Sequence, residues 1–231
     1  MTDDWTDQRT PAQEEQATFL VRTYLHLLAA VAAFVGIEMA LFRSGLANRV
    51  AVQMLSVNWL WCLGTFILVA ILFRWLAHKT SSRPVQYVGL ALYVVAESII
   101  FVPLLFEAEL IAPGTIETAA YVALLGFGAM TVGVFQTRYD FSFLAPFLGF
   151  FGLFALGLIV YSCLFGLELG LWFSTGMIVL AVGSTLYDTS AVLLRFDQED
   201  YVGAALELFA SMALLFWYVL RWAAEWASRR R

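Results

Sequence analysis

Four acidic residues stand inside long apolar runs of this chain, where an ionised side chain is costly. Glu97 lies in "LYVVAESIIFVPLL" and Asp188 in "STLYDTSAVLL", whereas Glu38 and Glu207 lie nearer the ends of their runs. A charge near the centre of a bilayer costs about 2.5–3.5 kcal/mol on insertion scales, so it must face protein or water. Carboxylate oxygens also suit a hard cation such as Ca²⁺. These four acids are therefore the candidates for chemistry.

Depth divides the four acids into two pairs. Glu97 and Asp188 lie too deep to reach an interface, which favours a role in an ion pathway or a buried network. Glu38 and Glu207 lie close enough to a helix end that a solvated carboxylate is the favoured interpretation. We therefore predict that Glu97 and Asp188 line any ion pathway, with the identity of a metal left open.

The chain carries no motif that indicates an enzyme. It has two histidines and two cysteines, and it lacks a Gly-rich phosphate loop and the hydrolase signatures HExxH and GxSxG. A net charge of -5 without a basic patch argues against nucleic acid as a partner. We expect no catalytic residue and no cofactor.

The elements that position these acids are predicted to be membrane helices. Hydrophobic residues make up 61% of the 231 positions and charged residues 13%, against roughly 45–50% and 25% in soluble domains. A bilayer core of about 30 Å needs about 20 apolar residues in a helix, and long runs without two-residue alternation favour helices. Seven runs qualify: 21–42, 56–77, 85–106, 116–136, 143–165, 169–193 and 202–222.

The predicted fold is an all-α polytopic membrane protein, a bundle of seven transmembrane helices. Residues 1–18 form a polar acidic tail, residues 19–226 the membrane domain, and residues 227–231 a basic tail. The glycines of "GFGAMTVG" and "GFFGLFALG" are expected to let neighbouring helices approach closely. Tryptophans near the predicted helix ends, Trp59 and Trp217 among them, are expected to anchor the chain at the headgroups.

The positions of Lys and Arg in short loops predict a cytoplasmic N-terminus. The first eighteen residues lack the features of a signal peptide, so the first run stays as a span, and no organelle signal is visible, which favours a bacterial inner membrane. Arg221, Arg229, Arg230 and Arg231 would lie outside if the seventh run spans, so a re-entrant seventh helix and the side of the C-terminus stay open. The predicted cytoplasmic side holds Arg9, Arg22, Arg74, Lys79, Arg83, Arg138 and Arg195, against Arg43 and Arg49 outside.

In order and spacing, several stretches resemble the transmembrane Bax inhibitor motif family. They are "FLVRTYLHLLA", "PVQYVGLALYVVAESIIFVPLL", "TRYDFSFLAPFLGF", "STLYDTSAVL" and "AALELFASMALLFWYVLR". The likeness covers nearly everything after Thr18. It implies a seven-helix fold with a central helix and, for some members, a calcium leak regulated by pH through two aspartates that share protonation.

Asp188 matches the first aspartate of that pair, but Ser211 stands where the second is expected. A serine brings no charge and cannot share a titration, so the pair is absent as such. Glu207 shares a helix face with Ser211, about 6 Å along the axis, and would rebuild a carboxylate pair if it reached Asp188. Alternatively, Asp188 acts alone, modulated by Ser211 or a nearby arginine. We favour the second alternative. A glutamate near the interface costs less free energy when water solvates it than when it is buried beside Asp188.

Two functions follow as expectations. The first is a leak channel or transporter for a cation, calcium by the resemblance, with a pathway lined by Glu97 and Asp188 and pH sensing by Asp188, Ser211 and Glu207. The second is a membrane regulator that conducts nothing and binds another membrane protein, such as a quality-control protease with which some bacterial relatives are associated. The lipid bilayer is a partner in both, and the oligomeric state stays open.

Overall fold

The computed structural model describes residues 11–79 and 82–230, which form eight α-helices and one short 3-10 helix. Seven of these helices are long and apolar enough to cross a membrane, which confirms the prediction of an all-α, seven-span membrane protein. The elements are α1 (Pro11–Arg43), α2 (Leu46–Ser56), α3 (Trp59–Lys79), α4 (Arg83–Ile111), α5 (Thr115–Thr137), η1 (Ser142–Leu144), α6 (Ala145–Phe165), α7 (Gly170–Leu194) and α8 (Tyr201–Ser228).

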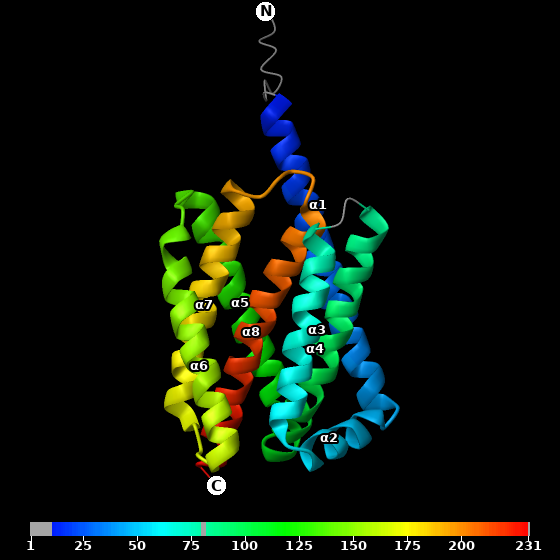
Figure 1. Ribbon diagram of the computed structural model, residues 1–231, viewed down its shortest axis with the longest axis vertical. Coiled ribbons are helices and arrows are strands. Elements are labelled where there is room, and N and C mark those ends of the chain that lie inside the picture. Colours follow the sequence, from blue (N-terminus) through cyan, green and yellow to red (C-terminus); the bar gives the residue numbers. More distant parts are fainter. Residues whose placement is uncertain (1–10, 80–81, 231) are drawn as a thin grey trace, which may run out of the picture.

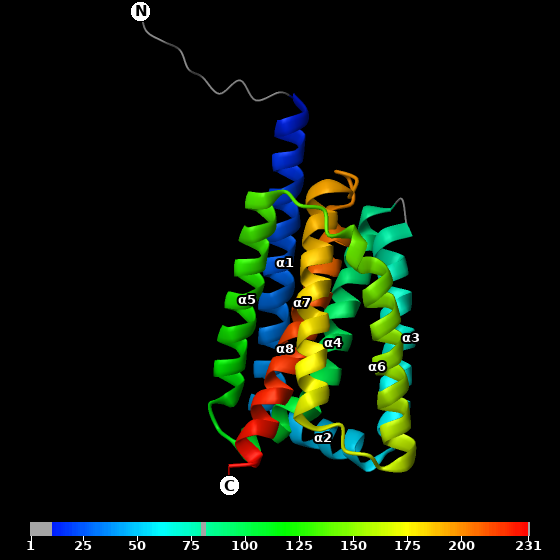
Figure 2. The same cartoon turned by 90° about the vertical axis from the view of Figure 1, so that its left-hand side faces the viewer.

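The long helices run side by side, up and down the bundle, with α8 in the middle (Figures 1 and 2). Helix α8 packs against α1, α3, α4, α5 and α7. Its residues from Val202 to Phe209 are buried, apart from half-buried Glu207, and a helix that is apolar nearly all round must be enclosed by others. The central helix implied by the family resemblance is therefore present.

Helix α8 crosses the whole bundle. It is a continuous helix of 28 residues, about 42 Å long by its rise per residue, and it ends at the opposite end of the bundle from the start of α1 (Figure 1). The re-entrant alternative for the seventh run is therefore wrong. Arg221, Arg229 and Arg230 lie toward the end of the bundle far from the start of α1, while Arg231 lies outside the described residues.

Helix α1 begins at Pro11, earlier than the predicted span at residue 21. Proline suits the first turn of a helix, where its missing N–H is not needed. The side-chain nitrogen Nε2 of Gln16 donates a hydrogen bond to the Leu193 carbonyl (3.0 Å), which fixes this part of α1 to the end of α7. Residues 11–18 of the predicted tail are thus helical, and residues 1–10 lie outside the described residues.

The helix ends follow from local chemistry. Gly166 ends α6 with a left-handed φ of 70°, which glycine adopts without steric cost, so the tight turn expected between the fifth and sixth spans is confirmed. Asp200 caps α8, because its carboxylate accepts a hydrogen bond from the Gly203 amide (3.2 Å).

Helix α2 was not predicted, because its residues read as a connection between two spans. It lies across the end of the bundle (Figure 2). Ala47 and Ala51, one turn apart, are buried against Val102 of α4. The small alanine side chains allow the short helix to lie close to α4, while its other apolar side chains, such as Leu55, stay exposed.

Close helix approach occurs at a glycine that the sequence did not single out. A Cβ atom on Gly89 would lie 2.9 Å from the Ala77 nitrogen and 3.0 Å from the Phe73 carbonyl, so α4 needs glycine here to pack on α3. The glycines expected to serve this purpose do not. Only Gly126 has a neighbour within 4 Å of its Cβ position, at 3.9 Å; the described residues leave open space beside Gly128, Gly133, Gly149, Gly152 and Gly157.

Candidate functional site

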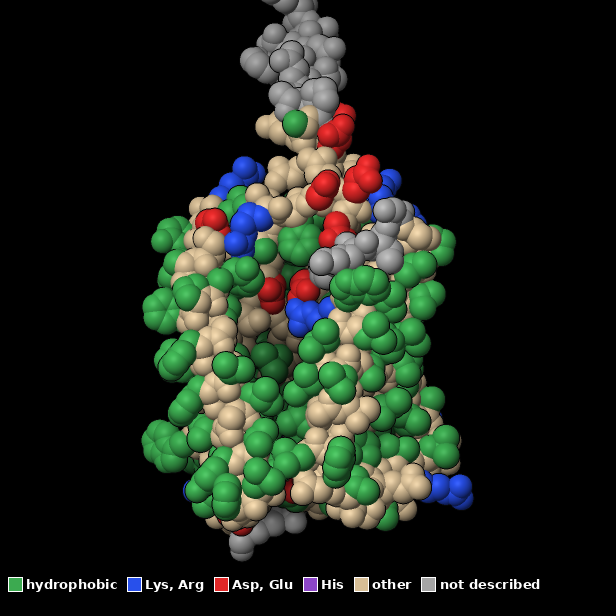
Figure 3. Space-filling model, viewed as in Figure 1, with side chains coloured by type: hydrophobic (Ala, Val, Ile, Leu, Met, Phe, Trp, Pro, Cys, Tyr) green, Lys and Arg blue, Asp and Glu red, His purple; other side chains and the backbone are tan. Residues whose placement is uncertain are grey.

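A cleft of about 260 Å³ runs along α8 between α3 on one side and α6 and α7 on the other. Figure 3 shows this hollow between two apolar columns, with acidic and basic side chains toward its upper end. We call it the Asp188 cleft. Its polar lining residues are Arg74, Glu97, Ser184, Asp188, Ser211, Tyr218 and Arg221.

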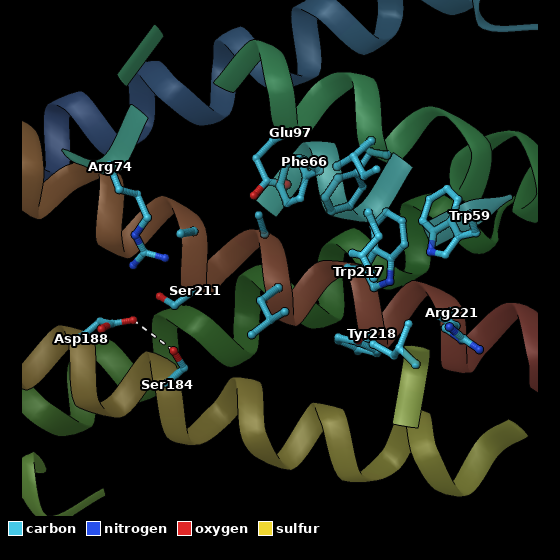
Figure 4. Close-up of a pocket in the computed structure, with 17 residues that line it drawn as sticks. Trp59, Phe66, Arg74, Glu97, Ser184, Asp188, Ser211, Trp217, Tyr218 and Arg221 are labelled. Atoms are coloured by element: carbon cyan, nitrogen blue, oxygen red, sulfur yellow. Dashed lines mark hydrogen bonds between the residues drawn. The ribbon is translucent and has the colours of Figure 1, made fainter. Parts of the chain in front are cut away.

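Asp188 lies six residues before the end of α7, about 9 Å from that end by helical rise. Ser184, one turn earlier, donates a hydrogen bond to its carboxylate (3.2 Å). Ser211 faces Asp188 from α8 (Figure 4). The Ser211 hydroxyl is within reach of that carboxylate and of the Leu208 carbonyl, to which it donates at 3.2 Å. The residue in the second aspartate position therefore does lie beside Asp188.

Glu207 forms an ion pair with Arg74 of α3. The Arg74 Nε also donates to Glu207 Oε1 at 3.2 Å, and the Glu207 side chain is only 16% exposed. The prediction of a solvated carboxylate at this position is therefore wrong. The structure directs Glu207 to Arg74 rather than to Asp188, which leaves Asp188 with serine neighbours and an arginine nearby.

Arg74 is the cation at this end of the cleft. Its guanidinium points toward Asp188 and Ser211 in Figure 4. The Arg74 guanidinium binds both carboxylate oxygens of Glu207 and also lies near Asp188. One positive charge therefore interacts with two carboxylates. In the sequence, Arg74 is only a basic residue near the end of α3. Neither its spacing nor its neighbours along the chain identify Glu207, which lies on another helix, as its partner.

Glu97 lies at the middle of α4 and is 7% exposed. It lines the Asp188 cleft, and buried Tyr93 lies one turn earlier on α4. Glu97 and Asp188 were predicted to line one pathway, and the structure does bring both into one cleft from different helices.

Aromatic side chains fill the middle of the cleft. Trp59 and Trp217 stack with ring centroids 6.4 Å apart, and Phe101 meets Trp217 edge-on at 4.9 Å. Trp59 and Trp217 both line the cleft, and their expected role as headgroup anchors stays a prediction. Trp172 fits that role better, since it is 90% exposed.

A second ionic group lies at the far end of the cleft. Arg221 Nε donates to Glu225 Oε1 at 2.9 Å, and the buried Ser174 hydroxyl donates to the other oxygen of Glu225 at 3.2 Å. In the sequence, Arg221 is only a positive charge near the C-terminus. Its spacing of four residues from Glu225 was the available signal, because such pairs face each other on a helix.

The cleft therefore places carboxylates and aromatic rings in series. From one end it offers Asp188 with Arg74, then Glu97, then Trp217, and last Trp59 and Arg221 (Figure 4). Glu225 is the partner of Arg221. No group of three or more His, Cys, Asp or Glu side chains that could hold a metal ion occurs within residues 11–79 and 82–230.

Glu38 lies away from this cleft. The prediction of a solvated carboxylate is wrong for Glu38 as well, because the residue is only 7% exposed. It lines a separate cavity between α1, α4, α5 and α8.

Residues 16–225 match the family described as "Inhibitor of apoptosis-promoting Bax1". The chain belongs to the Bax inhibitor family. The match includes all or most of each of the seven long helices.

Two curated relatives are similar to this Bax inhibitor family protein over part of their lengths. Bax inhibitor 1 of Schizosaccharomyces pombe is 28% identical over 167 residues, 71% of this chain and 60% of the relative. An uncharacterised protein of Pseudomonas aeruginosa is 36% identical over 110 residues, 45% of this chain and 47% of the relative. The matches thus span about half to three fifths of these relatives. No solved structure matches the chain significantly.

Proposed function

We propose that this Bax inhibitor family protein is a membrane leak channel or transporter for a cation, calcium in the first instance, modulated by pH. The observation that supports this most is the shared cleft of Asp188 and Glu97, two acids from different helices that membrane insertion would otherwise penalise. Their oxygens suit a hard cation.

The cleft also holds features expected of a gated pathway. The stacked Trp59 and Trp217 line it on the Arg221 side of Glu97. Protonation of Asp188 would remove the negative charge near Arg74 and so change which ionic arrangement is favoured. pH modulation through Asp188, with Ser211 and Arg74 as neighbours, is part of the proposal.

A flux assay tests the proposal directly. The full chain is reconstituted in liposomes that contain a calcium-sensitive dye, and the rate of calcium entry is followed from pH 6 to pH 8. We expect Asp188→Asn to change the rate or its pH dependence, and Glu97→Gln to lower the rate.

Asp140→Asn is the matched control. Asp140 lies near Arg195 (3.9 Å) with its side chain 46% exposed, outside the cleft lining. Equal flux at every pH in Asp188→Asn and wild type would remove Asp188 from the mechanism, and no flux above protein-free liposomes would refute transport.

The second candidate function is regulation through binding of another membrane protein. The observation that favours it is α6, which packs mainly on α7 and η1 and presents Phe147, Phe150 and Phe154 outward. Gly149 and Gly152 on α6 are also uncovered, and small residues promote contact between membrane helices.

Co-purification from native membranes tests this alternative. A partner should be retained by wild type and lost with Gly149→Leu and Gly152→Leu together, while calcium flux in liposomes stays unchanged. A chain lacking residues 1–16 shows whether the acidic N-terminal segment contributes. The same partners with all three proteins would argue against α6 and the tail as the docking elements.

We also propose a cytoplasmic N-terminus in an inner membrane. In that orientation the Arg74 end of the cleft faces the cytoplasm and the Arg221 end faces outward. Reporter fusions after residue 230 test it: activity of an exported reporter supports the orientation, and activity of a cytoplasmic reporter contradicts it.

A further inference from the structure

A second cavity, of about 430 Å³, lies between α1, α4, α5 and α8. We call it the Glu38 cavity. Helices α1 and α5 contact each other through Tyr24 and Phe135, whose rings are 5.8 Å apart, while farther along α1 the cavity separates them. Val35, Met39 and Leu124 line it and are 45–49% exposed. The cavity therefore opens sideways, between α1 and α5, toward the lipid.

The walls of the Glu38 cavity are apolar and rich in aromatic rings. Phe34, Phe209 and Phe216 line it, together with Leu105 and Met212. Phe34 and Phe209 are in contact, with ring centroids 6.2 Å apart. The volume lies within the range of about 300–1,000 Å³ that is usual for small-molecule sites. A molecule with an apolar body fits this lining.

One side chain in this lining lacks a partner. Glu38 is 7% exposed, and neither of its buried carboxylate oxygens has a hydrogen-bond partner among the described residues. A buried carboxylate is costly when it is neither paired nor hydrogen-bonded. None of the described residues that line the cavity is basic, and the other acid, Glu117, is exposed at the start of α5.

We propose that the Glu38 cavity binds a lipophilic amine that enters from the membrane, that is, a molecule with an apolar body and one ammonium group. Such an amine is protonated at neutral pH, since its pKa is about 10, as for lysine. The ammonium group pairs with the Glu38 carboxylate and the apolar body lies against the phenylalanine rings, whose faces also attract cations.

The charge of the cavity selects against other membrane molecules. An anionic or zwitterionic phospholipid would bring its phosphate toward Glu38 and Glu117, with no basic lining residue to receive it. A neutral alcohol can fill the apolar part but leaves Glu38 without a countercharge. The preferred ligand is therefore a simple amine.

Dodecylamine and dodecanol are suitable probes because they share one alkyl chain and differ in the head group. The full chain is placed in phosphatidylcholine nanodiscs, and binding is measured by native mass spectrometry and by the shift of the unfolding temperature with ligand concentration. For wild type we expect one dodecylamine per chain, bound at least about tenfold more tightly than dodecanol, as expected for a charge-assisted hydrogen bond.

Glu38→Gln should weaken dodecylamine binding about tenfold or more and leave dodecanol binding unchanged. Glu109→Gln is the matched control, an exposed acid of α4 outside the cavity lining, and should change binding less than about threefold. Equal binding of dodecylamine to Glu38→Gln and wild type would overturn the proposal, as would equal binding of the two probes to wild type.

A second variant keeps Glu38 and tests the cavity independently, in case Glu38→Gln does not fold. Ala120 lines the cavity from α5 and is only partly buried, so Ala120→Phe should narrow the space and weaken binding of both probes. Unchanged binding in Ala120→Phe would show that the amine binds elsewhere. The outcome is independent of calcium flux, because the Glu38 cavity and the Asp188 cleft are lined by different charged residues.

Discussion

Arg74 of α3 and Glu207 of α8 form an ion pair inside the bundle, one turn of α8 away from Ser211. This pair bears on the two alternatives for Asp188, which were a carboxylate pair with Glu207 or an aspartate that acts alone. Glu207 is neutralised by Arg74, so the charge nearest to Asp188 is a guanidinium rather than a second carboxylate. A serine and a shared arginine lie where the resemblance to the family implied a second aspartate.

The first prediction concerns the stability that this pair contributes. Glu207→Gln leaves Arg74 without its paired charge in a half-buried position, so the free energy of unfolding should fall by about 1–3 kcal/mol, between the values for surface and buried pairs. Thermal or denaturant unfolding in detergent measures the change.

Glu199→Gln is the control for this measurement. Glu199 pairs with Arg83 at 3.6 Å, but its side chain is 87% exposed, so its replacement should change stability by less than about 0.5 kcal/mol. A double-mutant cycle of Glu207→Gln with Arg74→Gln isolates the pair. A coupling energy near zero would show that the pair contributes no net stability.

The second prediction restores the carboxylate that the family pattern leads one to expect. Ser211→Asp places a second acid beside Asp188 in the cleft. Two carboxylates at this range cannot both ionise at low cost, so they should share one proton. Calcium flux should then depend more steeply on pH between 6 and 8 than in wild type.

Ser211→Asn is the control for that variant, because it has nearly the same size and no charge. It should keep the pH profile of wild type. If the aspartate and asparagine variants have the same pH profile, position 211 does not couple to the protonation of Asp188.

The third prediction concerns the aromatic group in the cleft. Trp217→Ala removes the ring that stacks on Trp59 and contacts Phe101, so calcium flux should rise several-fold while the protein loses about 3–5 kcal/mol of stability. Trp172→Ala, at a side chain that is 90% exposed, should change neither. An unaltered flux in Trp217→Ala would mean that the restriction lies elsewhere.

The fourth prediction tests helix packing at Gly89. A Cβ atom there would lie within 3.0 Å of the α3 backbone, so Gly89→Ala should force α3 and α4 apart and destabilise the protein by about 1–3 kcal/mol. Gly128→Ala is the comparison, since nothing described lies within 4 Å of its Cβ position. It should be neutral or stabilising by up to about 1 kcal/mol. Unfolding in detergent ranks the two, and equal stability would refute the steric argument.

The amino-acid sequence by itself determined the seven spans and the depth of Glu97 and Asp188 within them. These features are local, because span length follows from the thickness of the bilayer core and depth from the distance along a helix. For the same reason the turn at Gly166 was predictable, whereas the short helix α2 was not, since its burial depends on Val102 of another helix.

Only the tertiary structure decided which side chains meet across helices. The rotation of the helices against each other determines the partner of Glu207, the stacking of Trp59 on Trp217 and the isolation of Glu38. The spacing of residues within one helix does not reveal this rotation. Glu38 and Glu207 looked alike in the sequence, as acids near the ends of apolar runs. Packing gave Glu207 an arginine and enclosed Glu38 in an apolar cavity with no counterion among the described residues.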